Sequence, residues 1–214
     1  MRPLKNILFY TSLTLFGLLS YQLKGQTKSD SLIYDLLIND ELIGEMYVAK
    51  NVNGDASYNY SCFSNVDYHL LFSFNIQFFY LSNFDADGNY QSSEFKYLFN
   101  EDIKESNWIN CLGNKCYVYE GAEVKKILEN PLHRTTIEMY FNEPTEETWL
   151  FSERFGDNLK VEKEENDLFK IDFPGGNTCH YYYNKGVCSK VIINMLLSDM
   201  EFRLRKKYPL YSAK

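Results

Sequence analysis

The sequence has little of what most enzyme sites are built from. Its three histidines, His69, His133 and His180, lie far apart, and none has a neighbour at a spacing typical of metal ligands. It has no G-x-S-x-G, no H-E-x-x-H, no C-x-x-C and no glycine loop placed to cradle a phosphate. These absences argue against the common hydrolase, zinc-protease and nucleotide-binding classes, and we expect no catalytic residue of those types, no cofactor and no metal.

Two acidic features could suggest metal binding or acid-base chemistry. In the turn Asp85-Ala86-Asp87-Gly88 the glycine stands fourth and Lys96 twelfth, whereas a calcium-binding EF-hand loop needs glycine sixth and glutamate twelfth. The acidic residues within 143–147 and 162–167 crowd around expected turns, where solvated loops explain them better than a paired acid and base. We therefore expect an ordinary Asp-Gly turn at 85–88.

Basic residues are the minority, with 22 Lys and Arg against 29 Asp and Glu and a formal net charge of -7. An acidic chain is a poor match for a phosphate backbone, so we expect no nucleic-acid partner. A basic cluster at 203–207 alternates with Phe202 and Leu204, which indicates the solvent face of a final strand. The alternative for this cluster is contact with an anionic surface.

The N-terminal segment has the layout of a secretory signal peptide, with Arg2 and Lys5, an apolar run from Ile7 to Leu19, and polar residues up to Gln26. The run is shorter than the roughly 20 apolar residues that span a bilayer, which disfavours the alternative of an uncleaved anchor. Gly25 is a suitable small residue for cleavage. We expect a cut between Gly25 and Gln26 and export to the periplasm or the extracellular space.

The exported part contains five cysteines, Cys62, Cys111, Cys116, Cys179 and Cys188. In an oxidising compartment they can pair, and the odd count leaves at least one thiol unpaired. A two-residue Gly-Asn turn at 113–114 would make Cys111 and Cys116 a non-hydrogen-bonded pair with Cα atoms about 4.5 Å apart, inside the range of a disulfide. We therefore predict this structural disulfide.

A second pair of cysteines lies in a predicted hairpin but is not expected to bond. A three-residue loop at 184–186 would place Tyr182 opposite Cys188. Cys179 would then point to the opposite face of the sheet.

The fold class follows from short apolar-alternating runs separated by turn signals. Aromatic residues make up 17% of the chain and suit a pleated, half-buried surface. We predict a mainly β protein, a single antiparallel meander forming a strongly curved sheet, half-barrel or open barrel. Apolar residues at helical spacing, ended by Pro131, predict one short helical or irregular crossing near 121–134. The expected segments are a signal peptide at 1–25, a polar lead at 26–30, one β domain at 31–207 and a C-terminal tail at 208–214.

The predicted sheet opens with a hairpin of Ser31 to Ile38 and Glu41 to Lys50, turning at Asn39-Asp40. Gly44 lies inside its second strand, where a glycine weakens pairing unless the backbone bulges or another segment comes close.

The strongest alternation in the chain runs from Asp67 to Phe84 and predicts one long strand with a continuous apolar face. The residues of this face that form a candidate apolar binding surface are Tyr68, Phe72, Phe74, Phe78 and Tyr80. On a curved sheet such a face either joins the core or holds an apolar ligand, and both readings stay open at this point.

The exported part resembles a family of uncharacterised secreted proteins of Gram-negative bacteria, domain of unknown function 6134. The resemblance runs from about Ser31 to Lys207. Its residues are Tyr34-Asp35, Ile43-Gly44-Glu45, the stretch from Met139 to Pro144, Phe151-Ser152-Glu153 with Phe155-Gly156, and the hairpin from Tyr182 to Gly186. The chain is more distantly similar to another uncharacterised periplasmic β-sheet family. The resemblance implies a strongly curved antiparallel sheet in the periplasm, and it implies no activity, cofactor or catalytic residue.

The leading functional hypothesis is a non-enzymatic exported protein that binds a lipid, another apolar small molecule or an envelope protein partner on its concave face. Two other classes remain open. An enzyme would have to use a dispersed site, such as His180 with a nearby acid. A small outer-membrane β-barrel would need regular lipid-facing alternation and aromatic girdles, and charged residues interrupt the candidate strands.

Overall fold

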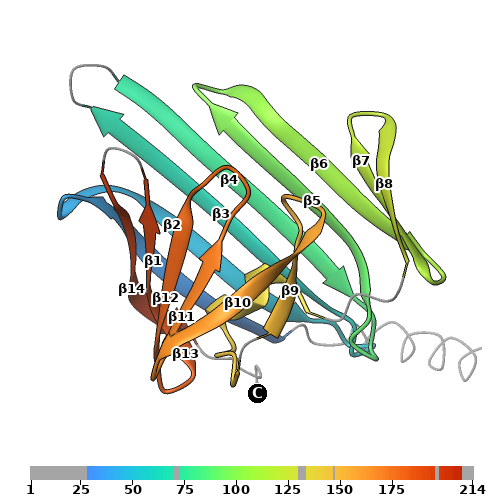
Figure 1. Ribbon diagram of the computed structural model, residues 1–214. Coiled ribbons are helices and arrows are strands. Elements are labelled where there is room, and N and C mark those ends of the chain that lie inside the picture. Colours follow the sequence, from blue (N-terminus) through green and yellow to red (C-terminus); the bar gives the residue numbers. More distant parts are fainter. Residues whose placement is uncertain (1–27, 70–72, 130–133, 147, 196–197, 209–214) are drawn as a thin grey trace, which may run out of the picture.

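The computed structural model describes residues 28–69, 73–129, 134–146, 148–195 and 198–208, which form one 14-stranded antiparallel sheet (Figure 1). The first strands are β1 (Lys28–Ile38), β2 (Glu41–Val52), β3 (Tyr58–His69), β4 (Ser73–Phe84), β5 (Tyr90–Phe99), β6 (Asp102–Leu112), β7 (Lys115–Glu120) and β8 (Glu123–Glu129). After the 3-10 helix η1 (Thr136–Tyr140) come β9 (Thr148–Ser152), β10 (Asp157–Glu165), β11 (Leu168–Asp172), β12 (Thr178–Asn184), β13 (Val187–Asn194) and β14 (Met200–Tyr208). The expected signal peptide lies outside the described residues.

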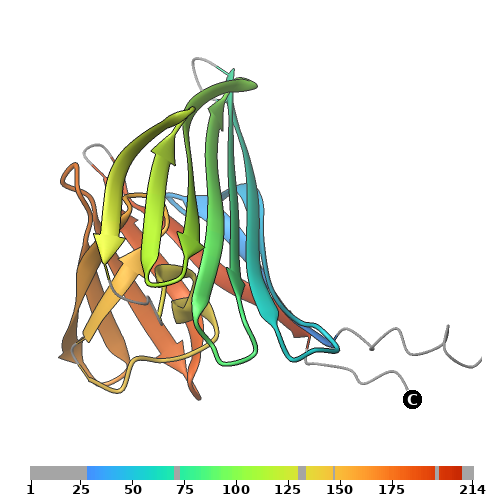
Figure 2. The ribbon, with the colours of Figure 1, turned by 90° about the vertical axis from the view of Figure 1, so that its right-hand side faces the viewer.

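Two runs of consecutive hairpins make the sheet. β1 to β8 pair in succession, β9 to β14 do the same, and β14 pairs with β1 to join the two runs. The edges of the sheet are therefore β8 and β9. Figure 2 shows the sheet curling so that its two halves face each other across an interior. The predicted antiparallel, strongly curved sheet is confirmed, and its shape is that of an open barrel.

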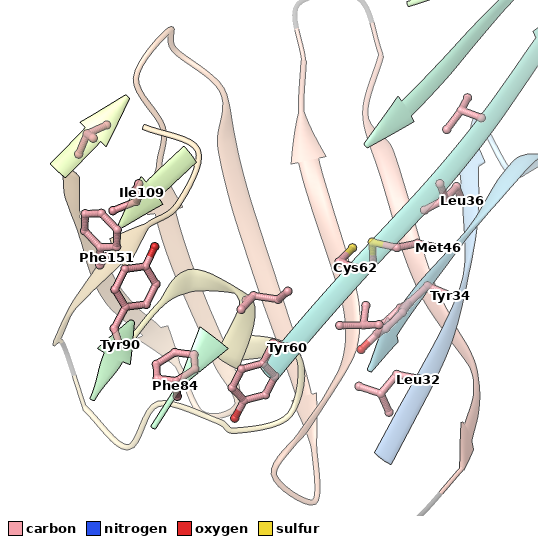
Figure 3. Packing of buried hydrophobic residues seen from close by; sticks show 14 of the residues in the cluster. Leu32, Tyr34, Leu36, Met46, Tyr60, Cys62, Phe84, Tyr90, Ile109 and Phe151 are labelled. Atoms are coloured by element: carbon pink, nitrogen blue, oxygen red, sulfur yellow. The ribbon is translucent and has the colours of Figure 1, made fainter. Parts of the chain in front are cut away.

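The two edges of the sheet, at β8 and β9, are linked by side-chain contacts rather than by backbone hydrogen bonds. No ladder joins β8 to β9 in the described ranges, but the Lys126 ammonium lies 3.2 Å from a carboxylate oxygen of Asp157. Inside the seam, Ile109 of β6 and Phe151 of β9 lie beside each other, with Tyr90 next to them (Figure 3). Side-chain contacts thus bridge the two edges, and the barrel stays open because no backbone pairing joins β8 to β9 in the described ranges.

The crossing predicted near 121–134 is wrong in position. Residues 123–129 form the edge strand β8, and the helical turn η1 comes later. A bulge opposite Val118 and Tyr119 adds one residue to β8, so that Val124 and Ile127 share the outer face and are 46% and 51% exposed. This bulge produces apolar residues three apart, which imitates the period of a helix. Residues 130–133, with Pro131, lie outside the described residues.

The single strand predicted from Asp67 to Phe84 is also wrong, because the chain reverses and β3 pairs with β4. The pairing places Tyr68 directly opposite Phe74 and His69 opposite Ser73. Even-numbered residues therefore face even-numbered residues, and the alternation continues unchanged through the turn. Such a hairpin cannot be told from a long strand by its period. Residues 70–72, with Phe72, lie outside the described residues.

Two clusters of buried side chains fill the barrel on either side of η1. One lies mainly under β1 to β7, and the other under β9 to β13. One hydrogen bond crosses between them, from the Tyr34 hydroxyl to the carbonyl of Cys188 at 2.7 Å. Within the second cluster, the Tyr183 hydroxyl of β12 donates to the carbonyl of Met139 in η1 at 2.9 Å. Figure 3 shows Tyr34 beside Met46 and Cys62 in the first cluster. These bonds fix the two halves of the barrel around the helical turn.

The predicted disulfide joins Cys111 to Cys116 across the β6–β7 hairpin. The prediction that Cys179 and Cys188 face opposite sides is wrong, although neither is disulfide-bonded. Lys185 adopts a positive φ of 53°, which permits a two-residue turn with Tyr183 opposite Cys188. Both thiols consequently point into the core.

Gly44 has both of the features that its position in a strand led us to expect. The pairing of β1 with β2 shifts register beside it, and the β3 backbone approaches so closely that an added Cβ would overlap the carbonyl oxygen of Asn65. The glycine therefore lets β2 and β3 pack at the bend of the sheet.

Candidate functional site

A cavity of about 490 Å³ lies inside the barrel, between the inner face of β2 to β5 and the inner face of β12 to β14. Its apolar lining comes from both halves of the sheet and from η1. The residues of this lining are Met46, Cys62, Ile76, Phe78, Tyr80, Tyr97, Ile137, Tyr140, Phe155, Phe173, Pro174, Tyr181, Val191, Ile193, Met195, Met200 and Phe202. Ser64, Thr136, Ser152, Arg154, Gly175 and Asn177 complete it. A second hollow of about 390 Å³ lies beside the disulfide and is lined by residues of the 85–91 and 111–116 segments.

The aromatic face predicted from sequence contributes to this cavity. Phe78 and Tyr80 line it, and the Phe78 ring stacks on Tyr97 with ring centroids 4.9 Å apart. Farther along the same face of β4, Phe74 contacts Tyr68 at 5.2 Å and Phe99 at 5.9 Å between ring centroids. The structure therefore brings Tyr68, Phe74, Phe78 and Tyr80 to one inner face.

That inner face continues beyond the cavity. β3 to β6 are longer than the strands opposite them and rise above the rest of the barrel (Figures 1 and 2). Tyr68, Phe74 and Phe99 lie near the β3–β4 and β5–β6 turns, so their rings form an aromatic shelf above the cavity. All three are only partly buried. The shelf extends the apolar surface that an elongated molecule in the cavity could touch.

Arg154, in the turn between β9 and β10, brings a charge to the cavity wall. Its Nε lies 3.1 Å from both carboxylate oxygens of Glu105, and its Nη2 donates to Oε2 of Glu105 at 2.7 Å. The guanidinium carbon lies 5.3 Å from the ring centroid of Phe95 and 5.0 Å from that of Phe155. The Asn107 amide also donates to the Arg154 carbonyl. β5 and β6 thus hold the turn against the inner wall.

The carboxylate of Glu105 stabilises the charged form of Arg154. Burial disfavours the charged form of Arg154, but the hydrogen bonds and the charge of Glu105 outweigh burial and raise the pKa of Arg154 above its ordinary value. The two side chains are about one-third exposed, at 33% and 34%. The pair is therefore a compensated one at the edge of the cavity rather than a lone cation.

Two acids lie beneath the cavity floor. Glu153 has no exposed surface, and its carboxylate accepts hydrogen bonds from the hydroxyls of Ser82 and Thr136, each at 2.9 Å. Glu138, also buried, accepts the backbone N–H of Thr135 at 3.1 Å. Burial raises the pKa of Glu153 and raises that of Glu138 to about 7. Both acids are used to fix η1 and the β9–β10 turn in place.

Helical turn η1 forms the floor itself. Thr136, Ile137 and Tyr140 line the cavity from below. The Tyr140 ring packs edge-on against Tyr34 at 5.5 Å and Tyr181 at 6.3 Å, so it joins both halves of the sheet. The position of η1 therefore depends on the packing of Tyr140 against both halves of the sheet.

His180, the residue named for a dispersed enzyme site, lies outside the cavity. It alternates with the buried Cys179 and Tyr181 on β12, so its side chain is on the outer face. Its Nε2 lies 3.5 Å from a carboxylate oxygen of Glu164. Among the described residues, no group of three or more His, Cys, Asp or Glu side chains is placed to hold a metal ion.

The outer face of the sheet differs sharply from the inner one. Ion pairs cross neighbouring strands there, such as Lys170 with Glu162 at 3.6 Å and Arg205 with Asp35 at 3.2 Å. A short apolar row, Tyr47, Phe63 and Phe79, runs across β2, β3 and β4 in register. In the part of the chain that is described, no helix is long and apolar enough to cross a bilayer.

The sequence analysis did not assign Arg154, Glu105 or Glu153 to a site, although Glu153 belongs to the stretch that carries the family resemblance. All three are ordinary polar residues, and two of them stand in a segment that reads as a turn, Glu153-Arg154-Phe155-Gly156. In the structure, a Cβ at Gly156 would meet the Val118 side chain at 2.9 Å. The close approach shows that this turn packs inside the barrel rather than in solvent.

Comparisons with known proteins support the fold. Residues 34–205 match the model of a family described as a domain of unknown function, DUF6134. No curated protein matches the chain. A crystal structure of a β-barrel-like protein of the domain of unknown function DUF1849 from Brucella abortus superposes with a TM-score of 0.54, at 14% identity, over 86% of this chain and 98% of that one. At that identity the similarity concerns the fold alone, and it agrees with the predicted distant similarity to a second β family.

Proposed function

Because the chain belongs to the DUF6134 family, a domain of unknown function, we propose its role from its own geometry: a non-enzymatic exported protein that binds a lipid or another apolar small molecule inside its barrel. The cavity carries this proposal. In a close-packed β core, side chains fill the interior. This barrel instead keeps about 490 Å³ open between two aromatic walls. Small-molecule sites typically measure roughly 300 to 1,000 Å³ and are mostly apolar.

The polar residues at the cavity favour binding over catalysis. Each carboxylate oxygen of Glu153 accepts a hydrogen bond from a hydroxyl, Glu138 holds the start of η1, and Arg154 is paired with Glu105. Each of these groups has a structural partner. A general acid or base needs a group that can exchange its proton with a bound substrate, and His180, the residue proposed for that work, faces away from the cavity.

The charged outer face of the sheet supports the proposal that water surrounds the barrel. A transmembrane barrel turns an apolar band outward, while here cross-strand ion pairs such as Lys170 with Glu162 occupy the outside and the apolar surface is inside. Export remains part of the proposal. It is supported by the signal-like N-terminal sequence and by the Cys111–Cys116 disulfide, since disulfides persist mainly in oxidising compartments.

Two neighbouring residues on β4 allow a matched test. Phe78 points into the cavity, and Phe79, the next residue, points outward between Phe63 and Lys96. The probe is N-phenylnaphthylamine, whose fluorescence rises in an apolar environment. We expect Phe78→Asp to weaken probe binding by about tenfold or more, because its carboxylate brings a hydrated charge into the cavity, while Phe79→Asp leaves binding within about twofold.

The fold of each variant is checked by near-ultraviolet circular dichroism. A folded Phe78→Asp variant with wild-type affinity would overturn the proposal. If Phe78→Asp does not fold, Met200→Trp serves instead, because it fills the cavity without adding a charge and should reduce probe binding in the same direction.

A further inference from the structure

We propose that the cavity selects uncharged amphiphiles, with a hydroxyl, ester or amide head group, over anionic ones, and that Glu105 is the residue that sets this selectivity. The inference rests on the proposed function, because it names the class of ligand for the same cavity. Arg154 is the only charged side chain among the described residues that line the cavity. An arginine at an apolar site would ordinarily predict an anionic ligand, such as a fatty acid. The surroundings of Arg154 argue against that prediction.

One of the two guanidinium edges of Arg154 that suit a carboxylate is already in use. Nε and Nη2 form this edge, which binds carboxylates in a fork, and both point at Glu105, at 3.1 and 2.7 Å. The faces of the guanidinium lie near the rings of Phe95 and Phe155. A ligand carboxylate would have to displace Glu105 or bind beside it. Binding beside Glu105 places two carboxylates on one arginine, and displacing Glu105 leaves that carboxylate without its arginine partner.

A further acid next to Arg154 strengthens this bias. Glu153 stands between Ser152 and Arg154, which both line the cavity, and its carboxylate accepts a hydrogen bond at 2.9 Å from Ser82, two residues along β4 from the cavity residue Tyr80. The pKa of Tyr80 is raised first by burial, while Arg154 lowers it and Glu153 and Glu105 raise it further. Glu105, which is bonded to Arg154, and Glu153, which is bonded to Ser82, therefore place two acids at this part of the cavity wall. An anionic head group at that point would meet repulsion that one compensated arginine does not offset.

Uncharged head groups meet no such repulsion and find hydrogen-bonding partners. Ser64, Thr136, Ser152 and Asn177 line the cavity with hydroxyl and amide groups that can donate or accept. These neutral groups suit an alcohol, ester or amide at the polar end of the ligand. The aromatic walls around Phe78 and Phe202 would take the hydrocarbon part.

The test compares two ligands that share one hydrocarbon chain, lauryl alcohol and lauric acid, as competitors of N-phenylnaphthylamine. At about pH 8 the free acid is ionised. We expect the alcohol to displace the probe from the wild-type protein at a concentration about tenfold or more below that of the acid. Equal displacement, or stronger displacement by the acid, would overturn the inference while leaving the proposed function intact.

Glu105→Gln tests the assigned residue through a gain of binding. The substitution keeps the size of the side chain and removes its charge, so Arg154 is left uncompensated. Affinity for lauric acid should rise by about tenfold or more, and affinity for the alcohol should stay within about twofold. Glu94→Gln, which removes an acid paired with Lys96 elsewhere on the sheet, is the matched control and should change neither. An unchanged acid affinity in folded Glu105→Gln would overturn the role of Glu105.

The failure of the proposed function would look different. If the probe binds nowhere and neither lipid binds in native mass spectrometry, the cavity is not a ligand site and both proposals are overturned together. If Glu105→Gln does not fold, the comparison of the two ligands on the wild-type protein still decides the preference for uncharged amphiphiles.

Discussion

The Ser82 hydroxyl donates to the Glu153 carboxylate at 2.9 Å, across 71 residues of sequence, and so joins β4 to the β9–β10 turn inside the barrel. Thr136 of η1 donates to the other carboxylate oxygen. The buried side chain of Glu153 thus connects β4, the β9–β10 turn that carries Arg154, and η1 at the cavity floor. Because buried charges need partners, this small network determines where the cavity walls stand.

Removing one donor should destabilise the fold. Ser82→Ala leaves a fully buried carboxylate oxygen without its hydroxyl partner, and we expect it to lower the free energy of unfolding by about 1 to 3 kcal/mol. Urea unfolding followed by tryptophan fluorescence measures the change. The control is Ser92→Ala on the outer face, which removes a side-chain bond to Asn83 that is only partly buried and should cost less. Equal costs for the two variants would contradict the network.

Stability should fall as the pH rises through the range in which Glu138 titrates. Burial raises the pKa of Glu138 from an ordinary 4.5 to about 7. Between these values the folded protein keeps a proton that the unfolded chain has released, so folding becomes less favourable as the pH increases and levels off above it. The fall from Glu138 is at most on the order of 3 kcal/mol, and burial of Glu153 acts in the same direction.

The matched variant for this effect is Glu138→Gln. Glutamine can still accept the Thr135 N–H, but it carries no titrating group. Urea unfolding at about pH 5 and pH 8 should show a smaller fall for the variant than for the wild-type protein, and greater stability of the variant at the higher pH. A fall of the same size in both proteins would show that Glu138 does not titrate in this range.

The Cys111–Cys116 disulfide should stabilise the protein modestly. It closes a short loop, with a sequence separation of 5, and the lower entropy of the cross-linked unfolded chain predicts a contribution of about 2 kcal/mol. Adding a reductant should lower the midpoint of urea unfolding accordingly. The double variant Cys111→Ala with Cys116→Ala should start from the lower stability and should not respond to the reductant. A wild-type protein that is indifferent to reduction would contradict this prediction.

The sheet was predictable from sequence because its signals are local. Tyr58 and Tyr60 alternate with polar Asn59 and Ser61, and Asn39-Asp40 turns the chain with positive φ at both positions. The local pattern gave a wrong prediction at a β-bulge and at a hairpin whose two strands continue the same alternation. The extra residue in β8 imitated a helix, and the even-to-even pairing of Tyr68 with Phe74 concealed a hairpin. Both errors concern how strands pair, and the spacing of apolar residues along the sequence does not show strand pairing.

The candidate site was only half predictable. Phe78 and Tyr80 carry a strong strand period, so their shared face could be identified in advance. Glu105 and Arg154 meet across 49 residues, and nothing in either local sequence marks them as partners. Their pairing depends on the return of the second half of the sheet across the first. Long-range charge pairs of this kind become visible only when the topology is known.

The most direct test of the central claim is native mass spectrometry of the protein expressed with its export segment and purified without detergent. The same sample is then measured under denaturing conditions. The account predicts an added mass that remains on the native protein and disappears on denaturation, and it predicts that Phe78→Asp loses this mass while Phe79→Asp retains it. A bare protein that stays bare after incubation with lauryl alcohol would contradict the claim that the barrel is a binding site.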